Sequence, residues 1–200
     1  MVSVKMLSRL GHLHPSSTKL FICDIQGAFK EKAVAMNSVI GVSKLMISVA
    51  KTLDIPVIVT EQYPRGLGKT VPEIDISGAK LFEKTLFSMA IPPVIEELKD
   101  TKSVVLCGLE SHVCVLQTTL DLLERGIDVH VLMDGTSSMR QYNRLAAFQR
   151  LRASGAVVTT SESVIFQLVK DASHPKFKEI SNLVKSFSAL QLNPELPESL

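Results

Sequence analysis

The stretch SVVLCGLESHVCVLQTTLDLLERG, residues 103–126, joins a strand, a polar turn and a helix. Residues 103–107 form a continuous apolar run, the pattern of a strand that is covered on both faces. The run stops at Gly108, and Cys114 is predicted to open a helix in which leucines recur at amphipathic spacing. Gly126 stands where a left-handed C-cap belongs. A strand that leads directly into a helix is the repeating unit of parallel α/β sheets.

The same unit repeats on both sides of this stretch. Further apolar runs predict strands at residues 20–23, 56–59, 81–82, 129–133 and 156–159. Helical spacing of apolar residues predicts helices around residues 36–53, 116–123, 145–152 and 164–168. The sequence TTSE, Thr159 to Glu162, has capping-box spacing ahead of the last of these. The alternation predicts a three-layer α/β sandwich with a mostly parallel sheet and right-handed crossovers.

The composition is that of an ordinary globular domain. The chain has 200 residues, of which 46% are hydrophobic and 21% are charged, and this length suits one domain with a full core. The net charge is +2 and the basic residues are scattered, which argues against a nucleic-acid partner. Apolar runs stay well below the roughly 20 residues of a membrane span, so no membrane partner is expected.

The cysteines and the chain ends indicate a compartment. Cys23, Cys107 and Cys114 are odd in number and contain no CxxC pair, which argues against a disulfide framework and favours a reducing compartment, the cytoplasm. Residues 1–19 contain three basic residues and no acid, so a mitochondrial address is the alternative to a solvated tail. Residues 188–200 are interpreted as a loose tail.

Ligands of parallel α/β sheets bind outside the carboxyl ends of the strands, and three reactive side chains are expected at that edge. Asp24 directly follows a buried strand, which suits its carboxylate to base chemistry, although aspartates there also cap helices and turns. Lys84 ends a short strand, although a lone lysine is usually a surface group. A thiolate at Cys114 would be stabilised by the helix dipole and by Lys84, although an isolated cysteine is most often a core residue. We interpret Cys23 and Cys107 as core residues.

No metal or cofactor motif accompanies these groups. His112 is interpreted as a pocket-lining residue and His130 as a buried strand residue, whereas His12 and His14 belong to the N-terminal tail. No pair of histidines has metal-ligand spacing beside carboxylates. The turn after the first strand has a single glycine, so neither a GxGxxG motif nor a P-loop is present. We therefore expect neither a metal nor a cofactor.

Three motifs, DIQGAF (24–29), FEKTLFSM (82–89) and GLESHVCV (108–115), together resemble those of the isochorismatase-like cysteine hydrolases in order and spacing. The stretches TEQYPRGLGKTVPEI and SESVIFQLV are most similar to the eukaryotic isochorismatase domain-containing proteins. The resemblance covers about residues 16–187, which leaves residues 1–15 and 188–200 as tails. It implies a six-stranded, Rossmann-like parallel sandwich that forms a homo-oligomer, a dimer or tetramer.

The resemblance also implies roles for individual residues. Cys114 would be the nucleophile, Asp24 the base that accepts its proton, and Lys84 the group that stabilises the charged pair. A non-proline cis peptide is implied between Leu109 and Glu110, with the amides of Glu110 and Cys114 as an oxyanion hole. The substrate pocket is expected to include Gln26, Phe29, Glu61, Tyr63 and His112.

Two departures from the family pattern bear on the substrate, and three hypotheses stay open. Nicotinamidases bind a divalent metal through histidines after the second strand, but TEQYPRGLGK contains none. Members that act on isochorismate can lack the cysteine, which this chain retains.

The first hypothesis is a metal-independent cysteine hydrolase of a small amide, carbamoyl or related C–N substrate. The second is a metal-dependent phosphoesterase or nuclease that binds Mg²⁺ through Asp24, Glu61 and Asp134. The third is a non-catalytic oligomeric scaffold.

Overall fold

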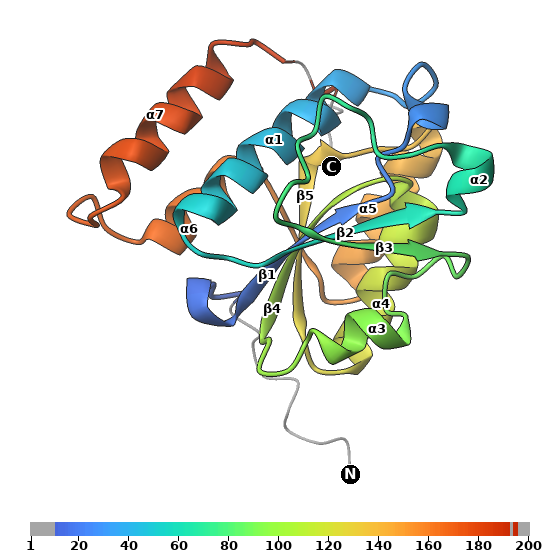
Figure 1. Ribbon diagram of the computed structural model, residues 1–200, viewed down its shortest axis with the longest axis horizontal. Helices are drawn as coiled ribbons and strands as arrows, with labels where there is room; N and C mark the ends of the chain where they lie inside the picture. The colour runs from blue at the N-terminus through green and yellow to red at the C-terminus, as the bar shows by residue number, and fades with distance from the viewer. Residues whose placement is uncertain (1–10, 193, 196–200) are drawn as a thin grey trace.

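The computed structural model describes residues 11–192, 194 and 195, and it contains an open sheet of six parallel strands (Figure 1). The order across the sheet is β3-β2-β1-β4-β5-β6, and every neighbouring pair is parallel. The strands are β1 Thr18–Cys23, β2 Val57–Gln62, β3 Lys80–Lys84, β4 Ser103–Gly108, β5 Asp128–Thr136 and β6 Val157–Thr159. The predicted fold class is therefore confirmed.

The strand order reverses between β1 and β4. The chain proceeds from β1 outward through β2 to β3, and it then returns to the other side of β1 with β4. In the register of this central pair, Cys23 lies opposite Gly108. A parallel sheet opens a crevice at such a switch point, because the loops above the two strands turn in opposite directions. A ligand crevice is therefore expected between the residues that follow Cys23 and those that follow Gly108.

Helices cover both faces of the sheet. One face is covered by α1 Met36–Thr52, α6 Ser161–Val169 and α7 Phe177–Ser188, and the other by α3 Pro92–Glu96, α4 Leu116–Glu124 and α5 Gln141–Ala153 (Figure 1). Four short helical segments complete the fold: η2 Pro15–Ser17, η3 Gly27–Phe29, α2 Pro64–Leu67 and η4 Ser111–Val115. Each face has its own apolar cluster, which explains why the strands read as continuous apolar runs.

Two strands extend further than their apolar runs. The run of β2 ends before Thr60, but the strand continues to Gln62 because Thr60–Gln62 pair with β3. The run of β5 ends before Asp134, but this strand continues to Thr136, which pairs with Gly108 across a register irregularity. The polar residues at the carboxyl ends of β2 and β5 therefore belong to these strands. Their side chains alternate between the two faces of the sheet, as in any strand.

The helix ends largely follow the turn chemistry of the sequence. Gly126 and Gly155 have positive φ angles after α4 and α5. The cap of α6 lies one residue later than the TTSE spacing indicates: Thr160, not Thr159, accepts a hydrogen bond from the Ser163 amide. Asp134 adds a second cap, because its carboxylate accepts from the amide and hydroxyl of Ser161.

The described parts of both chain ends pack on the domain. Leu13 is fully buried, and the Arg144 guanidinium donates to the carbonyl of Pro194 at 2.6 Å. The basic N-terminal stretch, for which a mitochondrial address is the alternative to a solvated tail, falls largely on residues 1–10, outside the described residues. Within the described residues, none of the helices has the length and apolar character needed to cross a membrane.

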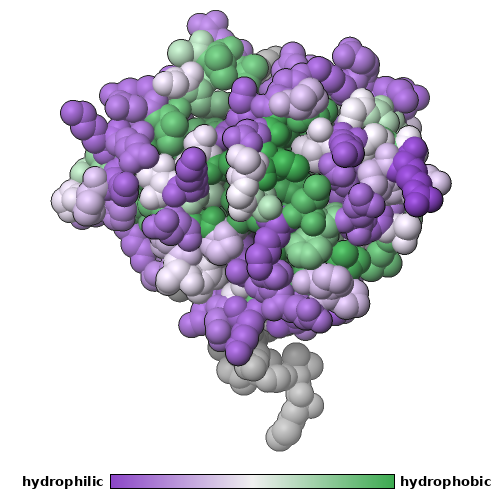
Figure 2. All heavy atoms as spheres, in the orientation of Figure 1, coloured by the Kyte–Doolittle hydropathy of each residue, from purple (hydrophilic) through white to green (hydrophobic). Residues whose placement is uncertain are grey.

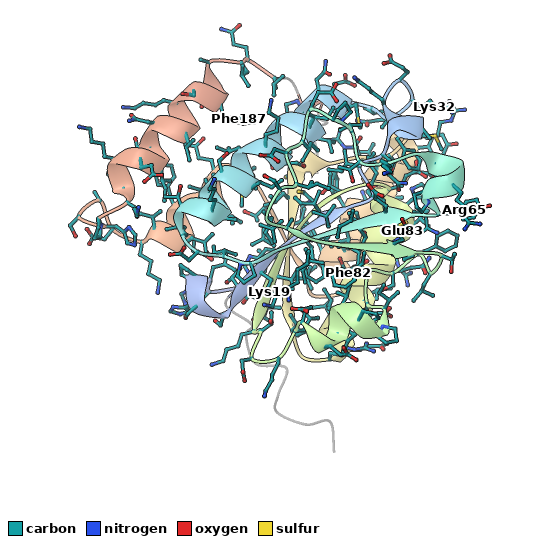
Figure 3. The ribbon with its side chains drawn as sticks, in the orientation of Figure 1. Lys19, Lys32, Arg65, Phe82, Glu83 and Phe187 are labelled. Atoms are coloured by element: carbon teal, nitrogen blue, oxygen red, sulfur yellow. The ribbon has the colours of Figure 1, made fainter. Side chains whose placement is uncertain are left out.

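Hydrophilic side chains dominate the rim of the face in Figure 2, with hydrophobic atoms exposed between them in the middle of the view. The basic residues labelled in Figure 3 come from separate parts of the chain: Lys19 from β1, Lys32 from the loop before α1, and Arg65 from α2. These three cations therefore come from separate elements and do not form one cluster.

Candidate functional site

Asp24 is the first residue after β1, and its carboxylate is buried at the switch point. Its φ angle is +49°, so the backbone turns sharply out of the strand. One carboxylate oxygen, Oδ1, accepts from the Thr60 hydroxyl at 2.8 Å. The other, Oδ2, accepts from the Lys84 ammonium at 2.7 Å and from the Cys23 thiol at 3.6 Å. Asp24 is therefore neither a helix cap nor a turn cap, because its side chain is bonded to other strands.

Lys84 ends β3, and its ammonium is the buried cation of the site. Its side chain is 0% exposed, which overturns the alternative of a surface lysine. Besides Asp24, the ammonium donates to Gln62 Oε1 at 2.7 Å and to the carbonyls of Phe87 at 2.8 Å and Leu86 at 3.2 Å. A buried ammonium loses its hydration, and hydrogen bonds to several acceptors compensate for this loss.

Cys114 lies within a helical turn and does not open it, which corrects the sequence prediction. The segment η4 is a π-helical turn from Ser111 to Val115 that runs directly into α4, with Glu110 as its N-cap. Cys114 is 6% exposed and belongs to the apolar cluster under α4. The peptide bond between Leu109 and Glu110 is cis, at the position that the resemblance implied.

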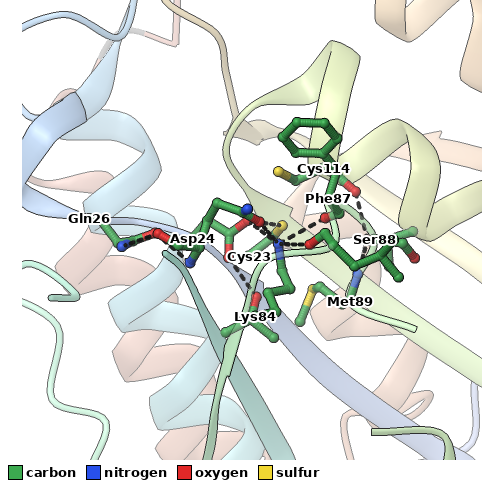
Figure 4. A network of polar contacts seen from close by, with 12 residues as sticks. Cys23, Asp24, Gln26, Lys84, Phe87, Ser88, Met89 and Cys114 are labelled. Carbon is green, nitrogen blue, oxygen red and sulfur yellow. Dashed lines mark hydrogen bonds and ion pairs between the residues drawn. The ribbon is translucent and has the colours of Figure 1, made fainter. Parts of the chain in front are cut away.

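The thiol of Cys23 neighbours both Asp24 and Cys114. Cys23 is the last residue of β1, and its thiol donates to Asp24 Oδ2 at 3.6 Å; it also interacts with the Cys114 thiol, and Figure 4 draws both cysteines at this edge of the sheet. Burial, the bond to Cys114 and the charge of Asp24 together raise the pKa of the Cys23 thiol well above its usual value. Among the described residues, Cys23 rather than Cys114 is the thiol hydrogen-bonded to the carboxylate. Asp24 and Lys84 are thus in direct contact, whereas the Cys114 thiol interacts with Cys23, the neighbour of Asp24.

Cys107 is remote from this group. It lies in β4 with its side chain on the α1 face of the sheet, whereas Cys23 and Cys114 belong to the opposite face. Its sulfur lies 3.5 Å from the Ser43 hydroxyl of α1. Burial raises the pKa of the Cys107 thiol to about 12. Cys107 is therefore a core residue, as predicted.

A sheet that brings a buried carboxylate, a buried ammonium and two thiols to its switch point also matches a known family. Residues 18–163 match the isochorismatase domain. The chain belongs to the isochorismatase family. Members of this family are generally hydrolases.

Three relatives illustrate the range of the isochorismatase family. Isochorismatase domain-containing protein 2 of Xenopus laevis is 48% identical over 181 residues, which are 89% of this chain and 88% of that protein. A solved structure described as the MAR1 ribonuclease of Caenorhabditis elegans is 44% identical, with a TM-score of 0.87, covering 94% of this chain and 99% of that one. The ycaC gene product of Escherichia coli is described as an octameric hydrolase of unknown specificity. It is 21% identical with a TM-score of 0.72, and the match covers 90% of this chain and 97% of that one. At this identity the likeness shows the fold alone.

The pocket residues expected in this isochorismatase fold have different surroundings. Gln26 is fully buried, and its amide bonds to the backbone of Gln62 at 2.8 and 3.0 Å and to the carbonyl of Gly68 at 2.6 Å, so it ties two loops together. Glu61 is also buried, and it accepts from the amide and hydroxyl of Thr70. Phe29 packs against the core under α1. These three side chains are occupied by structural contacts.

Tyr63 and His112 remain closer to solvent. Tyr63 follows β2 and is 54% exposed. His112 is partly buried, and its Nδ1 lies 3.1 Å from the Ser138 hydroxyl, which also contacts the Ser111 hydroxyl at 2.5 Å. His112 therefore contacts the loop after β5.

That loop, residues 137–139, holds the turn before Cys114 in place. The Ser111 amide donates to the Ser137 carbonyl at 2.8 Å, and the Ser137 amide donates to the Gly108 carbonyl at 3.2 Å. The Met139 amide donates to the Glu110 carboxylate at 2.9 Å. These bonds fix both ends of the turn, as a site that aims backbone amides at a reacting atom requires.

The three carboxylates of the hypothetical Mg²⁺ site do not meet. Asp24 bonds to Thr60 and Lys84, while Glu61 and Asp134 are each engaged by other backbone and hydroxyl groups. In the part of the chain that the structure describes, no cluster of three or more His, Cys, Asp or Glu side chains could hold a metal ion. The metal-centre hypothesis is therefore wrong for this set of residues.

Proposed function

We propose that this protein is a metal-independent cysteine hydrolase of a small amide, carbamoyl or related C–N substrate. The observation that carries the proposal is the buried Asp24–Lys84 ion pair beside the thiols of the switch point. Buried ion pairs contribute little net stability, so a sheet that keeps one at its ligand-binding edge favours a chemical role.

The proposed reaction begins with the Cys114 thiol. Its proton passes to Asp24, and the thiolate attacks the carbonyl carbon of the substrate. This transfer leaves the net charge of the buried group unchanged, because the thiolate replaces the carboxylate as the partner of the Lys84 ammonium. The amides of Glu110 and Cys114 stabilise the developing oxyanion.

Collapse of the adduct breaks the C–N bond and completes the first half of the reaction. The leaving nitrogen takes the proton that Asp24 holds, and the acyl group remains on Cys114 as a thioester. Water then attacks the thioester, gives up its proton to Asp24 and releases the acid and the thiol. No step needs a metal.

The experiment that tests the proposal is a substrate panel with two inhibitors. Amides, carbamoyl compounds, isochorismate and RNA are assayed with and without EDTA and iodoacetamide, and RNA is included because of the name of the Caenorhabditis elegans relative. We expect turnover of a C–N substrate that iodoacetamide abolishes and EDTA leaves intact. Hydrolysis that EDTA alone abolishes would contradict the proposal, and inactivity on the whole panel would favour the scaffold hypothesis.

The assembly and the compartment are part of the same proposal. The octameric Escherichia coli relative supports a homo-oligomer for this chain, which light scattering of the purified protein measures. The three free cysteines support a reducing compartment such as the cytoplasm. A fluorescent fusion to the C-terminus tests this location against the mitochondrial alternative.

A further inference from the structure

The proposed reaction uses one thiol, but the site contains two in contact. Cys23 ends β1 and Cys114 lies in η4, ninety-one residues later, and the two side chains meet on the same face of the sheet. The two thiols belong to one apolar cluster and interact, and the Cys23 thiol also donates to Asp24 Oδ2 at 3.6 Å (Figure 4). Cys23 has no part in the hydrolytic steps proposed above.

The two thiols differ in access to solvent. Cys114 is 6% exposed, whereas Cys23 is 0% exposed. A small oxidant that enters from solvent therefore meets Cys114 first. A thiol that is oxidised to a sulfenic acid condenses with a neighbouring thiol when one is within reach.

We propose that Cys23 is the resolving thiol of Cys114, so that hydroperoxides convert the pair reversibly into a Cys23–Cys114 disulfide. In the first step the Cys114 sulfur attacks the peroxide, the O–O bond breaks, and the products are a Cys114 sulfenic acid and water or an alcohol. In the second step the Cys23 sulfur attacks the sulfenic sulfur, the S–O bond breaks, and water leaves. The two thiols are oxidised by two electrons, and the peroxide is reduced by two.

The surroundings of Cys23 supply the proton transfer that the second step needs. The thiol must lose its proton to attack, and its raised pKa opposes this loss in the resting state. Asp24 Oδ2 already accepts the hydrogen bond from this thiol, and Lys84 lies 2.7 Å from the same oxygen. Once Cys114 is a sulfenic acid, Asp24 can take the Cys23 proton as the Cys23 sulfur attacks. The network that serves hydrolysis thus also serves disulfide formation.

The disulfide would switch off the proposed hydrolase without destroying it. Both sulfurs would be bonded, so Cys114 could not attack a substrate until a thiol reductant restores it. Without Cys23, the sulfenic acid would proceed to sulfinic and sulfonic acids, which thiols do not reverse. This regulatory consequence rests on the proposed function, but disulfide formation itself needs no substrate.

Peptide mass mapping of the full-length protein tests the proposal. The native protein is treated with hydrogen peroxide, free thiols are blocked with an alkylating reagent at acidic pH in denaturant, and the digest is mapped. We expect one linked pair, the peptides of Cys23 and Cys114, with Cys107 still alkylated, and we expect dithiothreitol to restore both free thiols. A Cys107→Ser variant, which changes only the thiol on the opposite face, should form the same link.

The isosteric variant Cys23→Ser supplies the opposite result. It should form no intramolecular link, and Cys114 should instead gain two or three oxygen atoms that dithiothreitol does not remove. The proposal is overturned if wild-type Cys114 is over-oxidised while Cys23 stays reduced, or if the link joins Cys107. Because the readout is mass, a linked pair in a protein that turns over nothing would support this inference and contradict the proposed function.

Discussion

The Lys84 ammonium lies 2.7 Å from the Asp24 carboxylate, although the two residues come from strands separated by β2. Thr60 and Gln62, two residues apart on β2, bridge this separation: Thr60 bonds to the carboxylate and Gln62 to the ammonium. Residues two apart on a strand point to the same face, so one strand supplies both contacts. The central strand β2 therefore supports both charges of the ion pair, and the carbonyls of Leu86 and Phe87 after β3 add further acceptors for the ammonium.

Removing one member of this pair should destabilise the fold. Lys84→Met leaves the Asp24 carboxylate buried without its cation, which should cost about 3–5 kcal/mol of unfolding free energy. The double variant Asp24→Asn with Lys84→Met removes both charges and should recover a large part of the loss. Urea denaturation of the wild type, both single variants and the double variant measures the coupling. Additive losses in the double variant would show that the two charges do not stabilise each other.

Replacing the proposed nucleophile should abolish activity without loss of the fold. Cys114→Ser should lower kcat on the order of 10³-fold or more, because a serine hydroxyl is far less acidic than a thiol. The matched control is Cys107→Ser, which removes a buried thiol from the other face and should keep kcat within about twofold. Steady-state kinetics on the substrate found in the panel measures both. Equal activity of the two variants would eliminate Cys114 as nucleophile.

The three thiols should react with iodoacetamide in the native protein in a definite order. Cys114 should be alkylated first, because it alone of the three cysteines is partly exposed to solvent. Cys23 and Cys107 should react slowly, because both are fully buried and the pKa of each thiol is raised, that of Cys107 to about 12. Timed mass mapping at neutral pH gives the three rates. Similar rates would mean that the site opens as a whole.

Most of the sheet is predictable from the sequence, because parallel strands that are covered on both faces are continuous apolar runs. The polar extensions of β2 and β5 are not, because Thr60, Gln62 and Asp134 look like the end of a strand until the pairing partner is known. The contact of the Lys84 ammonium with Gln62 was not predicted for this reason. A predicted strand that reached Gln62 would have placed the side chains of Thr60 and Gln62 on the same face of the sheet.

Cys23 shows a different limit of sequence reasoning. A cysteine within an apolar run is usually a core residue, and Cys23 is indeed fully buried. Its contact with Cys114 depends on the pairing of β1 with β4 and on the path of the turn after Gly108, which are long-range features. The available signal was its position, one residue before Asp24 at the end of a strand. A residue at that edge faces the ligand crevice even when its neighbours in sequence are apolar.

His130 should make stability depend on pH in the acidic range. Burial lowers the pKa of this imidazole below its ordinary value of 6.5, and its Nε2 has no hydrogen-bond partner among the described residues. Below about pH 6.5 the unfolded chain binds a proton that the folded protein binds only at lower pH, so stability is lost as pH falls. Unfolding free energies of the wild type and His130→Leu between pH 5 and 8 measure this effect. The variant should show the shallower slope, and identical slopes would assign the pH dependence to other groups.

Gly108 should be the least replaceable glycine of the site. It ends β4 with a φ angle of +127°, and a β-carbon at this position would lie 2.1 Å from the carbonyl oxygen of Cys23. Neither backbone can yield without moving the turn that leads to Cys114 or the strand end that carries Asp24. Gly108→Ala should therefore lower the free energy of unfolding by several kcal/mol, on the order of 3 or more.

The control is Gly126→Ala, where φ is +78° but nothing lies within 4 Å of the added carbon. About 1 kcal/mol is expected there from backbone strain alone. Urea denaturation compares the two variants, and iodoacetamide labelling of Cys114 reports whether the turn has moved. A Gly108→Ala protein as stable as Gly126→Ala, with unchanged labelling of Cys114, would show that the close approach of β1 and β4 does not position the site.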